Sequence, residues 1–334
     1  MKIKLFTHTD LDGVGCAVLA YLAFGSWSVD VEYCDYSDIN RKVADYICTQ
    51  KWEKYDKTYI TDISISDVLA IIINELNEQY NVRLFDHHAT ALGLNEYDWC
   101  EVRVNDTLSK TKTCGTAIFF RHLIDLECFV DFKPRVINNM ISFVKIVRDY
   151  DTWRWRDIGE KGVVCKQVND LFYIYGRDKF IKWITRQIYT FVNPKDTCSS
   201  CEDKQFPDFS EDDRALLDQK QKEIDIYVDE KDEQLIRKID ESSYIYGLVF
   251  AERYFSEVGN RLCELHPDLD YVVLIDISKG KVSYRTIKDN IDLGGEIAHS
   301  YGGGGHKKAA GSTFDKEMVV DSVTEIIFKN EEEA

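Results

Sequence analysis

The sequence predicts an α/β protein with an N-terminal parallel-sheet domain, helices on both faces of that sheet, a linker helix, and a smaller C-terminal α/β domain with a mixed sheet. Two observations support this fold class. Short strand-like runs alternate with helical runs of about a dozen residues along the first part of the chain, which is the pattern of a parallel sheet. The length of 334 residues also exceeds what one hydrophobic core ordinarily serves. We expect domains at residues 1–192 and 239–330, joined by a linker at 193–238.

The first domain is expected to contain four strands, each short and rich in apolar residues. They lie at residues 2–6, 29–34, 57–60 and 82–85. Helices with apolar residues at helical spacing follow the first three strands, at residues 13–24, 40–51 and 66–80. Ligands of such sheets collect beyond the carboxyl ends of the strands. Polar residues that follow the first, third and fourth strands should therefore face one crevice.

The rest of the chain predicts a helical region, a boundary and a second sheet. Residues 116–148 and 179–191 have helical patterns. Residues 193–210 hold two of the four prolines together with Asp and Ser, which marks a domain boundary. A charged helix is expected next, followed by three strands of the second domain. These elements lie at residues 211–235, 244–250, 271–275 and 281–286.

Composition limits the function classes. The net charge of −17 would repel long nucleic acids, whose binding depends on many Lys and Arg contacts with phosphate, so a nucleic-acid substrate should be short. No run approaches the ~20 apolar residues of a membrane span, and the start of the chain reads directly into a strand, so we expect a cytoplasmic protein without membrane contact. The ten cysteines then favour reduced thiols. Cys198 and Cys201 have the spacing of half a zinc site, although a solvated loop explains them more simply.

Metal-binding side chains are concentrated after three of the expected strands. His8-Thr9-Asp10-Leu11-Asp12-Gly13 follows the first strand, Asp62 the third, and Asp86-His87-His88 the fourth. Two cations about 3.5–4 Å apart can activate water and stabilise the leaving oxygen in phosphodiester hydrolysis. Carboxylates suit Mg²⁺ and Mn²⁺, and an added imidazole favours Mn²⁺. An aspartate that caps a helix explains one carboxylate but not the set. The sequence therefore predicts a two-metal phosphoesterase centre.

A glycine-rich run near the C-terminus predicts a separate anion-binding element. Gly302-Gly303-Gly304-Gly305-His306 provides backbone N–H groups that can approach a ligand closely. Residues 279–308 hold six Lys or Arg and three acids, about +3 within an acidic chain. Arg285, on an expected strand, offers a guanidinium fork that suits phosphate. A flexible loop is the alternative explanation of the glycines.

The three N-terminal motifs resemble those of the DHH phosphoesterase superfamily, which is named for the triplet seen here at residues 86–88. Its members include RecJ-type exonucleases, nanoRNases (oligoribonucleases), cyclic-dinucleotide phosphodiesterases and manganese-dependent pyrophosphatases. The resemblance implies that Asp10 and Asp12 bind different metals, that Asp62 bridges them, and that His87 is a ligand. It also implies catalytic roles for His88 beside the scissile phosphate, for Asp62, and for Asp86, which orients a histidine.

Two parts of this resemblance leave alternatives open. The fourth motif is an aspartate after a hydrophobic segment. Asp149 fits it better, because Trp153 provides a bulky apolar residue four positions on, and Asp151 is the alternative. His8 lies two residues before the first aspartate, a spacing similar to that of the RecJ and nanoRNase branches. Whether His8 ligates metal stays open.

The C-terminal run resembles the DHH-associated domain, whose signature is the GGGGH loop with an arginine some twenty residues upstream. This resemblance implies that Arg285, His306 and the loop residues Gly303, Gly304 and Gly305 bind the terminal phosphate or nucleotide of the substrate.

We therefore expect an exonuclease-type phosphodiesterase that uses two Mn²⁺ ions, with Mg²⁺ as the alternative, to hydrolyse short RNA or DNA oligonucleotides. Hydrolysis of linear or cyclic dinucleotides, or of 3′-phosphoadenosine 5′-phosphate, is the alternative activity. An inactive nucleotide-binding protein on the same fold is the alternative outside the enzymes, but no metal-site carboxylate is missing. RNA or DNA preference, cleavage polarity and formation of a homodimer stay open.

Overall fold

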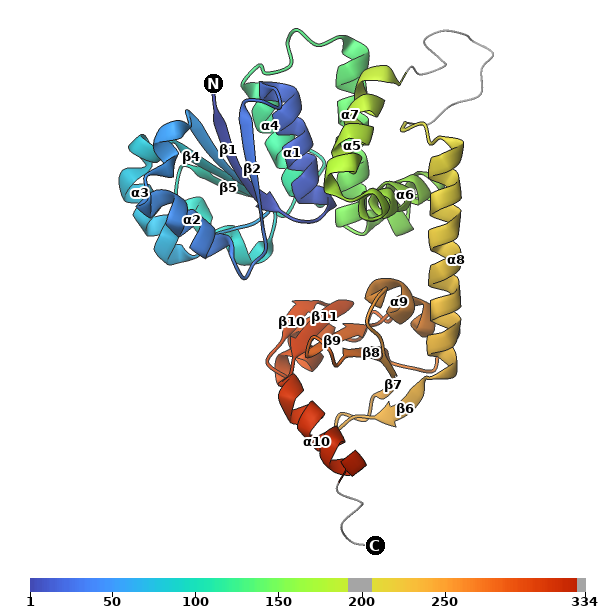
Figure 1. The fold of residues 1–334 in the computed structure, drawn as a ribbon. Helices are drawn as coiled ribbons and strands as arrows, with labels where there is room; N and C mark the ends of the chain where they lie inside the picture. The colour runs from blue at the N-terminus through green and yellow to red at the C-terminus, as the bar shows by residue number, and fades with distance from the viewer. Residues whose placement is uncertain (192–205, 329–334) are drawn as a thin grey trace, which may run out of the picture. The chain divides into compact units, whose positions relative to one another are not determined.

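The computed structural model describes residues 1–191 and 206–328 (Figure 1), apart from the side chains of residues 76–79. The chain folds into two compact units, Met1–Leu217 and Asp218–Ala334. The division falls inside helix α8 (Glu211–Glu233), which lies within the expected linker. Cys198, Cys201 and most of the expected boundary at residues 193–210 lie outside the described residues, so the predicted domain limits stay predictions.

The first unit is built on a five-stranded sheet in which every neighbouring pair is parallel, in the order β2-β1-β3-β4-β5. The strands are β1 (Ile3–His8), β2 (Val29–Cys34), β3 (Lys57–Thr61), β4 (Val82–Asp86) and β5 (Cys100–Val102). The first four lie where the sequence predicts them, and the three-residue β5 is additional. A parallel sheet confirms the predicted fold class of this unit.

Helices cover both faces of this sheet, as Figure 1 shows. Helices α1 (Leu11–Phe24) and α4 (Gly115–Asp125) share one core with Ile3 and Leu5 of β1. Helices α2 (Ile39–Cys48) and α3 (Asp67–Tyr80) share the other core with Phe6. This division follows from the alternation of side chains along β1, which sends odd and even residues to opposite faces.

Three further helices extend the first core and differ partly from expectation. They are α5 (Pro134–Asp151), α6 (Glu160–Tyr175) and α7 (Arg177–Thr190). The helical run expected at 116–148 is two helices, α4 and α5. The backbone of Glu127 is left-handed (φ 57°), which ends a helix, and Pro134 suits a first turn because its nitrogen has no hydrogen to donate. Helix α6 falls in a segment without a predicted element. Short helices are η1 (Lys51–Lys54), η2 (Ala89–Glu96) and η3 (Arg154–Arg156).

The second unit has a six-stranded mixed sheet in the order β10-β11-β9-β8-β7-β6. The β7–β8 pair is parallel and the other pairs are antiparallel. The strands are β6 (Ile236–Ile239), β7 (Ile245–Phe250), β8 (Tyr271–Asp276), β9 (Lys281–Arg285), β10 (Gly304–His306) and β11 (Ala309–Thr313). Helix α9 (Phe255–Leu265) packs on one face and the short helix η5 (Leu293–Ala298) on the other, and α10 (Lys316–Phe328) follows β11. No helix among the described residues has the length and apolar character to cross a bilayer.

Candidate metal centre

The predicted metal-binding side chains meet at one edge of the parallel sheet. Neighbouring parallel strands end on the same side, so residues at their carboxyl ends converge. His8 ends β1, Asp86 ends β4, and Asp62 directly follows β3. Asp62 has φ 57°, an uncommon backbone conformation for an aspartate, at the point where the chain leaves the strand. Such conformations occur at functional sites more often than elsewhere.

The first set of donors is His8, Asp10 and Asp62, whose ligand atoms lie within 4.8 Å of one another. Nδ1 of His8 is 2.9 Å from Oδ2 of Asp10 and 3.8 Å from Oδ2 of Asp62. Asp10 is also the N-cap of α1, because its Oδ1 accepts a hydrogen bond from the backbone N–H of Gly13. Oδ1 of Asp10 therefore caps the helix while Oδ2 faces His8, so the capping role and the metal role that the sequence presents as alternatives do not exclude each other.

The second set of donors is Asp12, His87 and Asp151, again within 4.8 Å of one another. Nε2 of His87 lies 3.7 Å from Oδ2 of Asp12 and 3.5 Å from Oδ2 of Asp151. Burial lowers the pKa of His87, which favours the neutral imidazole that metals bind. Each oxygen of Asp12 also accepts a backbone hydrogen bond at the start of α4, from Gly115 (2.6 Å) and Thr116 (2.8 Å). These bonds fix the orientation of that carboxylate.

Asp62 lies between the two sets. Its Oδ2 faces His8, and its Oδ1 is 3.3 Å from Nε2 of His87. Its residue is 1% exposed, and no hydrogen-bond donor among the described residues is directed at Oδ2. Burial, followed by the nearby carboxylates of Asp12 and Asp10, raises the pKa of Asp62 well above its usual value. Buried carboxylates this close together are costly without positive charge between them. The donor set therefore fits two hard divalent cations that share Asp62.

Asp86 holds the third motif in place. Its Oδ1 accepts hydrogen bonds from the backbone N–H of His87 (2.7 Å) and from Nδ1 of His88 (2.7 Å), and its Oδ2 accepts one from the hydroxyl of Ser64. Burial disfavours the charged form of Asp86, but the hydrogen bonds from His88 and Ser64 outweigh it and lower the pKa. Likewise the hydrogen bond to Asp86 overcomes burial and raises the pKa of His88. These bonds place Asp86 where it can orient the His88 ring, and that role stays a prediction.

The structure brings Asp151 to the centre and leaves Asp149 outside it. Oδ1 of Asp149 accepts hydrogen bonds from Nε (2.9 Å) and Nη2 (2.7 Å) of Arg148, and Nη1 of Arg154 lies 3.4 Å away. Asp149 belongs to none of the donor sets among the described residues. Asp151 ends α5 and faces His87. The geometry thus favours the alternative, Asp151, over Asp149 for the fourth motif, because the two residues lie on opposite sides of one helix and only Asp151 faces His87.

One residue of the centre has no counterpart in the sequence-based prediction. Tyr36 follows the end of β2, and its hydroxyl is 2.9 Å from Nε2 of His88. Its ring centroid lies 5.1 Å from that of His8. The rule that ligands gather at strand ends applies to β2 as well, so it could have indicated Tyr36.

A curated relative decides the family. Oligoribonuclease NrnB of Bacillus subtilis (strain 168) is 35% identical over 316 residues, which are 94% of this chain and 73% of the relative. The chain belongs to the nanoRNase-like branch of the DHH superfamily. No family model matches the chain.

Solved structures agree on the DHH fold. The DHH domain of a member of the s1p family of ribosomal proteins superposes with a TM-score of 0.58 at 13% identity, covering 98% of this chain and 87% of that one. RecJ of Thermus thermophilus, solved in complex with Mn²⁺, gives a TM-score of 0.55 at 13% identity, covering 97% of this chain and 51% of that one. At these identities the likeness concerns the fold alone.

In the second unit of this DHH protein, Arg285 and His306 occupy one row of the mixed sheet. Arg285 is paired with Ala309, and Ala309 is paired with His306 on its other side. Paired residues point to the same face, so the two side chains flank Ala309 about 10 Å apart, two strand spacings. Nη2 of Arg285 is 3.2 Å from the hydroxyl of Ser256 in the first turn of α9. The N-cap residue of α9, Tyr254, makes no side-chain cap hydrogen bond, and helix starts with free N–H groups favour anions.

The glycines of the run at residues 302–305 are not all required for the same reason. A Cβ at Gly303 would lie 2.1 Å from the carbonyl oxygen of Gly311, and one at Gly305 would lie 2.7 Å from Cα of Ala310. Gly302 has φ 69°, where only glycine is comfortable. Packing and backbone conformation therefore explain these three. Nothing lies within 4 Å of a Cβ at Gly304, so glycine at that position has no steric reason within the described residues.

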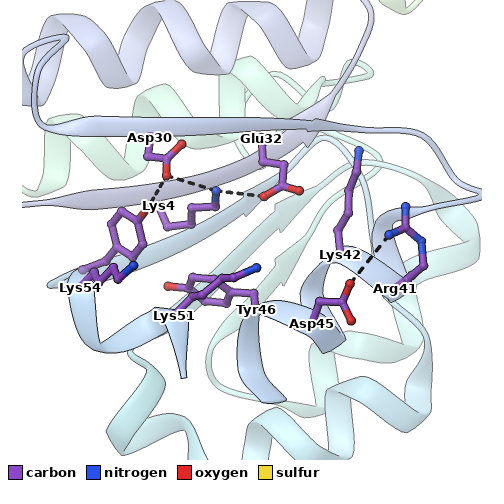
Figure 2. A pocket seen from close by; sticks show the side chains of 10 residues that line it. Lys4, Asp30, Glu32, Arg41, Lys42, Asp45, Tyr46, Lys51 and Lys54 are labelled. Carbon is purple, nitrogen blue, oxygen red and sulfur yellow. Dashed lines mark hydrogen bonds and ion pairs between the residues drawn. The ribbon is translucent and has the colours of Figure 1, made fainter. Parts of the chain in front are cut away.

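A hollow of about 250 Å³ beside β1, β2 and α2 is a different feature from the metal centre (Figure 2). None of the candidate metal ligands lines it. Five basic and three acidic side chains do, and the buried Lys4 is paired there with Glu32 (2.9 Å) and Asp30 (3.4 Å). The charge of the Lys4 ammonium group is thus neutralised within the first unit, and we assign this hollow a structural role.

Proposed function

We propose that this protein is a phosphodiesterase that uses two divalent cations to hydrolyse short oligonucleotides from one end. The observation that carries the proposal is the arrangement of two donor sets around the shared carboxylate of Asp62. Paired cations with a shared carboxylate suit hydrolysis of phosphate esters. The relative's name, oligoribonuclease, supports the same reaction class.

His8, Asp10 and Asp62 would hold one cation, and Asp12, His87 and Asp151 the other. Asp62 would be shared, because its Oδ1 lies 3.3 Å from Nε2 of His87. When bound, the cations lower the pKa of the attacking water and neutralise charge on the phosphate. The mixture of carboxylate and imidazole favours Mn²⁺ over Mg²⁺. RecJ of Thermus thermophilus, which shares the fold, has been solved with each of these ions.

The protein's own groups supply orientation and charge. Asp86 fixes the imidazole of His88, whose raised pKa keeps a proton available for a hydrogen bond to a phosphate oxygen. Donors that are held in place before the reaction stabilise developing negative charge without reorganisation. In the second unit, Arg285, His306 and the glycine run would bind a terminal phosphate or nucleotide of the substrate. That role is supported by the shared row of Arg285 and His306 and by the steric freedom at Gly304.

The charge of the chain supports a short substrate. A net charge of −17 opposes the many phosphate contacts that hold long polymers. We therefore propose dinucleotides to short oligonucleotides as the substrate range. Linear or cyclic dinucleotides and 3′-phosphoadenosine 5′-phosphate would fit the same phosphate chemistry and serve as comparison substrates.

The test is cleavage of labelled RNA and DNA series, from dinucleotides to chains of some two dozen nucleotides, with Mn²⁺, Mg²⁺ or chelator. We expect cleavage that requires a divalent cation and favours the shortest chains. Equal rates on long and short chains would contradict the length preference. An Asp62→Asn protein that keeps full activity would contradict the metal mechanism. Labels at either end of the substrate determine polarity.

A further inference from the structure

Tyr36 reaches the centre from the loop that follows β2. His8 and Cys34 are paired in the sheet register, so this loop begins beside the end of β1. The Tyr36 ring lies edge-on to the His88 ring, with centroids 5.8 Å apart at 88°. The residue is nevertheless 55% exposed. Its hydroxyl therefore points into the centre while much of the side chain faces solvent.

The hydroxyl of Tyr36 and the imidazole of His88 point at the same small region. Nδ1 of His88 is bonded to Asp86, which directs Nε2 toward the hydroxyl of Tyr36 at 2.9 Å. With Nδ1 donating to Asp86, Nε2 of the neutral ring accepts from the hydroxyl, whereas Nε2 of the charged ring donates to it. A phosphate oxygen is a stronger acceptor than either group. A phosphate oxygen placed beside Nε2 of His88 would therefore lie within hydrogen-bond distance of the Tyr36 hydroxyl, which can turn its proton from the imidazole to that oxygen.

We propose that Tyr36 is a substrate-contacting residue whose hydroxyl, beside Nε2 of His88, donates to one non-bridging oxygen of the phosphate being cleaved. This proposal rests on the proposed function and adds a residue to its phosphate site. In the absence of phosphate the two groups bond each other, which keeps both in position. The ligand class is a nucleotide phosphodiester or phosphomonoester.

The loop does not depend on the hydroxyl for its shape. The backbone N–H of Asp35 donates to Oδ1 of Asp38 (2.8 Å), and Lys42 donates to the carbonyl oxygen of Tyr33 (2.6 Å) and lies 2.7 Å from Oδ2 of Asp38. Contact between the rings of Tyr36 and His8 also survives removal of the hydroxyl. Tyr36→Phe is therefore a clean removal of one donor.

The experiment compares Tyr36→Phe with wild type and with Tyr33→Phe. The hydroxyl of Tyr33 has no hydrogen-bond partner among the described residues, so Tyr33→Phe is a matched control in the same strand region. Measurements are kcat/KM on a dinucleotide, the Kd of adenosine 5′-monophosphate, and the Kd of Mn²⁺ alone. For Tyr36→Phe we expect kcat/KM to fall about tenfold to a hundredfold, weaker nucleotide binding, and unchanged Mn²⁺ binding. Tyr33→Phe should match wild type.

A double mutant separates contact with phosphate from positioning of His88. In a His88→Ala background, Tyr36→Phe should still lower kcat/KM about threefold or more, because the hydroxyl touches the substrate itself. No further loss in that background, or wild-type kinetics of the single mutant, would overturn the proposal. A parallel loss of Mn²⁺ affinity would also overturn it. Failure of the proposed function is distinguishable, since wild type would then cleave no substrate while the nucleotide-binding comparison could still be made.

Discussion

Gly303 and Gly304 are adjacent glycines for which the structure predicts opposite consequences of the same substitution. At Gly303 an added methyl would meet the carbonyl oxygen of Gly311 at 2.1 Å and Cβ of Ser312 at 2.7 Å. Both contacts involve β11, so the strand must shift. Overpacking of this kind costs about 1–3 kcal/mol. Gly303→Ala should therefore lower the melting temperature.

At Gly304 the added methyl meets nothing within 4 Å, and the residue is not among the glycines with positive φ. Replacing such a glycine with alanine ordinarily stabilises by about 0.4–1 kcal/mol, because the unfolded chain loses freedom. If the backbone here approaches a phosphate, the methyl blocks that approach. Loss of a hydrogen bond to a charged group costs about 1.5–3 kcal/mol, or about tenfold to a hundredfold in kcat/KM.

The assay is a thermal melt together with dinucleotide hydrolysis for both variants. Gly304→Ala should slightly raise the melting temperature and lose activity, whereas Gly303→Ala should lower the melting temperature. Full activity of Gly304→Ala would refute a close approach of substrate at this position. A destabilised Gly304→Ala would refute the steric argument itself.

Three further predictions concern the first unit. Asp151→Asn should abolish most metal-dependent activity, and Asp149→Asn should keep the Mn²⁺ affinity of wild type. Metal titrations in which Asp149→Asn loses Mn²⁺ affinity and Asp151→Asn keeps it would restore Asp149 to the fourth motif. Burial raises the pKa of Asp62, so the metal-free protein should lose stability as pH rises above the usual aspartate range, and melts in chelator should show a weaker trend for Asp62→Asn. Burial lowers the pKa of His122 from 6.5 to about 4, so its contribution to stability should be lost as pH falls between these values. His122→Phe should reduce that acid sensitivity in pH-dependent melts, and an unchanged profile would contradict it.

Much of the fold was predictable because its signals are local. The first four strands and the helices between them follow from apolar periodicity, and Asp10, Asp12 and Asp62 follow from their places at strand ends. The helix break after Asp125 could not be predicted. It is caused by the left-handed backbone of Glu127, and glutamate is not a residue type that signals a helix end. Tertiary context fixes such a choice, and a single sequence does not record it.

The choice between Asp149 and Asp151 shows a different limit. Side chains two residues apart on a helix are rotated by about 200° about the helix axis, so the two carboxylates point in nearly opposite directions. Both residues follow the same hydrophobic segment, and the position of Trp153 made Asp149 the better match to the motif. Only the packing of α5 decides which one faces His87 and which faces Arg148 and Arg154. Tyr36 was missed for a similar reason, since its role depends on a partner 52 residues away.

Gly115 has a consequence for how the centre could change. Its N–H is bonded to Asp12, and a Cβ added to it would lie 2.6 Å from Cβ of Asp62. One backbone position at the start of α4 therefore acts as the spacer between two carboxylates. Helix α4 is anchored in a hydrophobic core. That core, and not an adjustable loop, therefore sets the distance between the two donor sets. On the two-cation proposal, changing the spacing between the cations would therefore require moving helix α4 rather than exchanging a ligand.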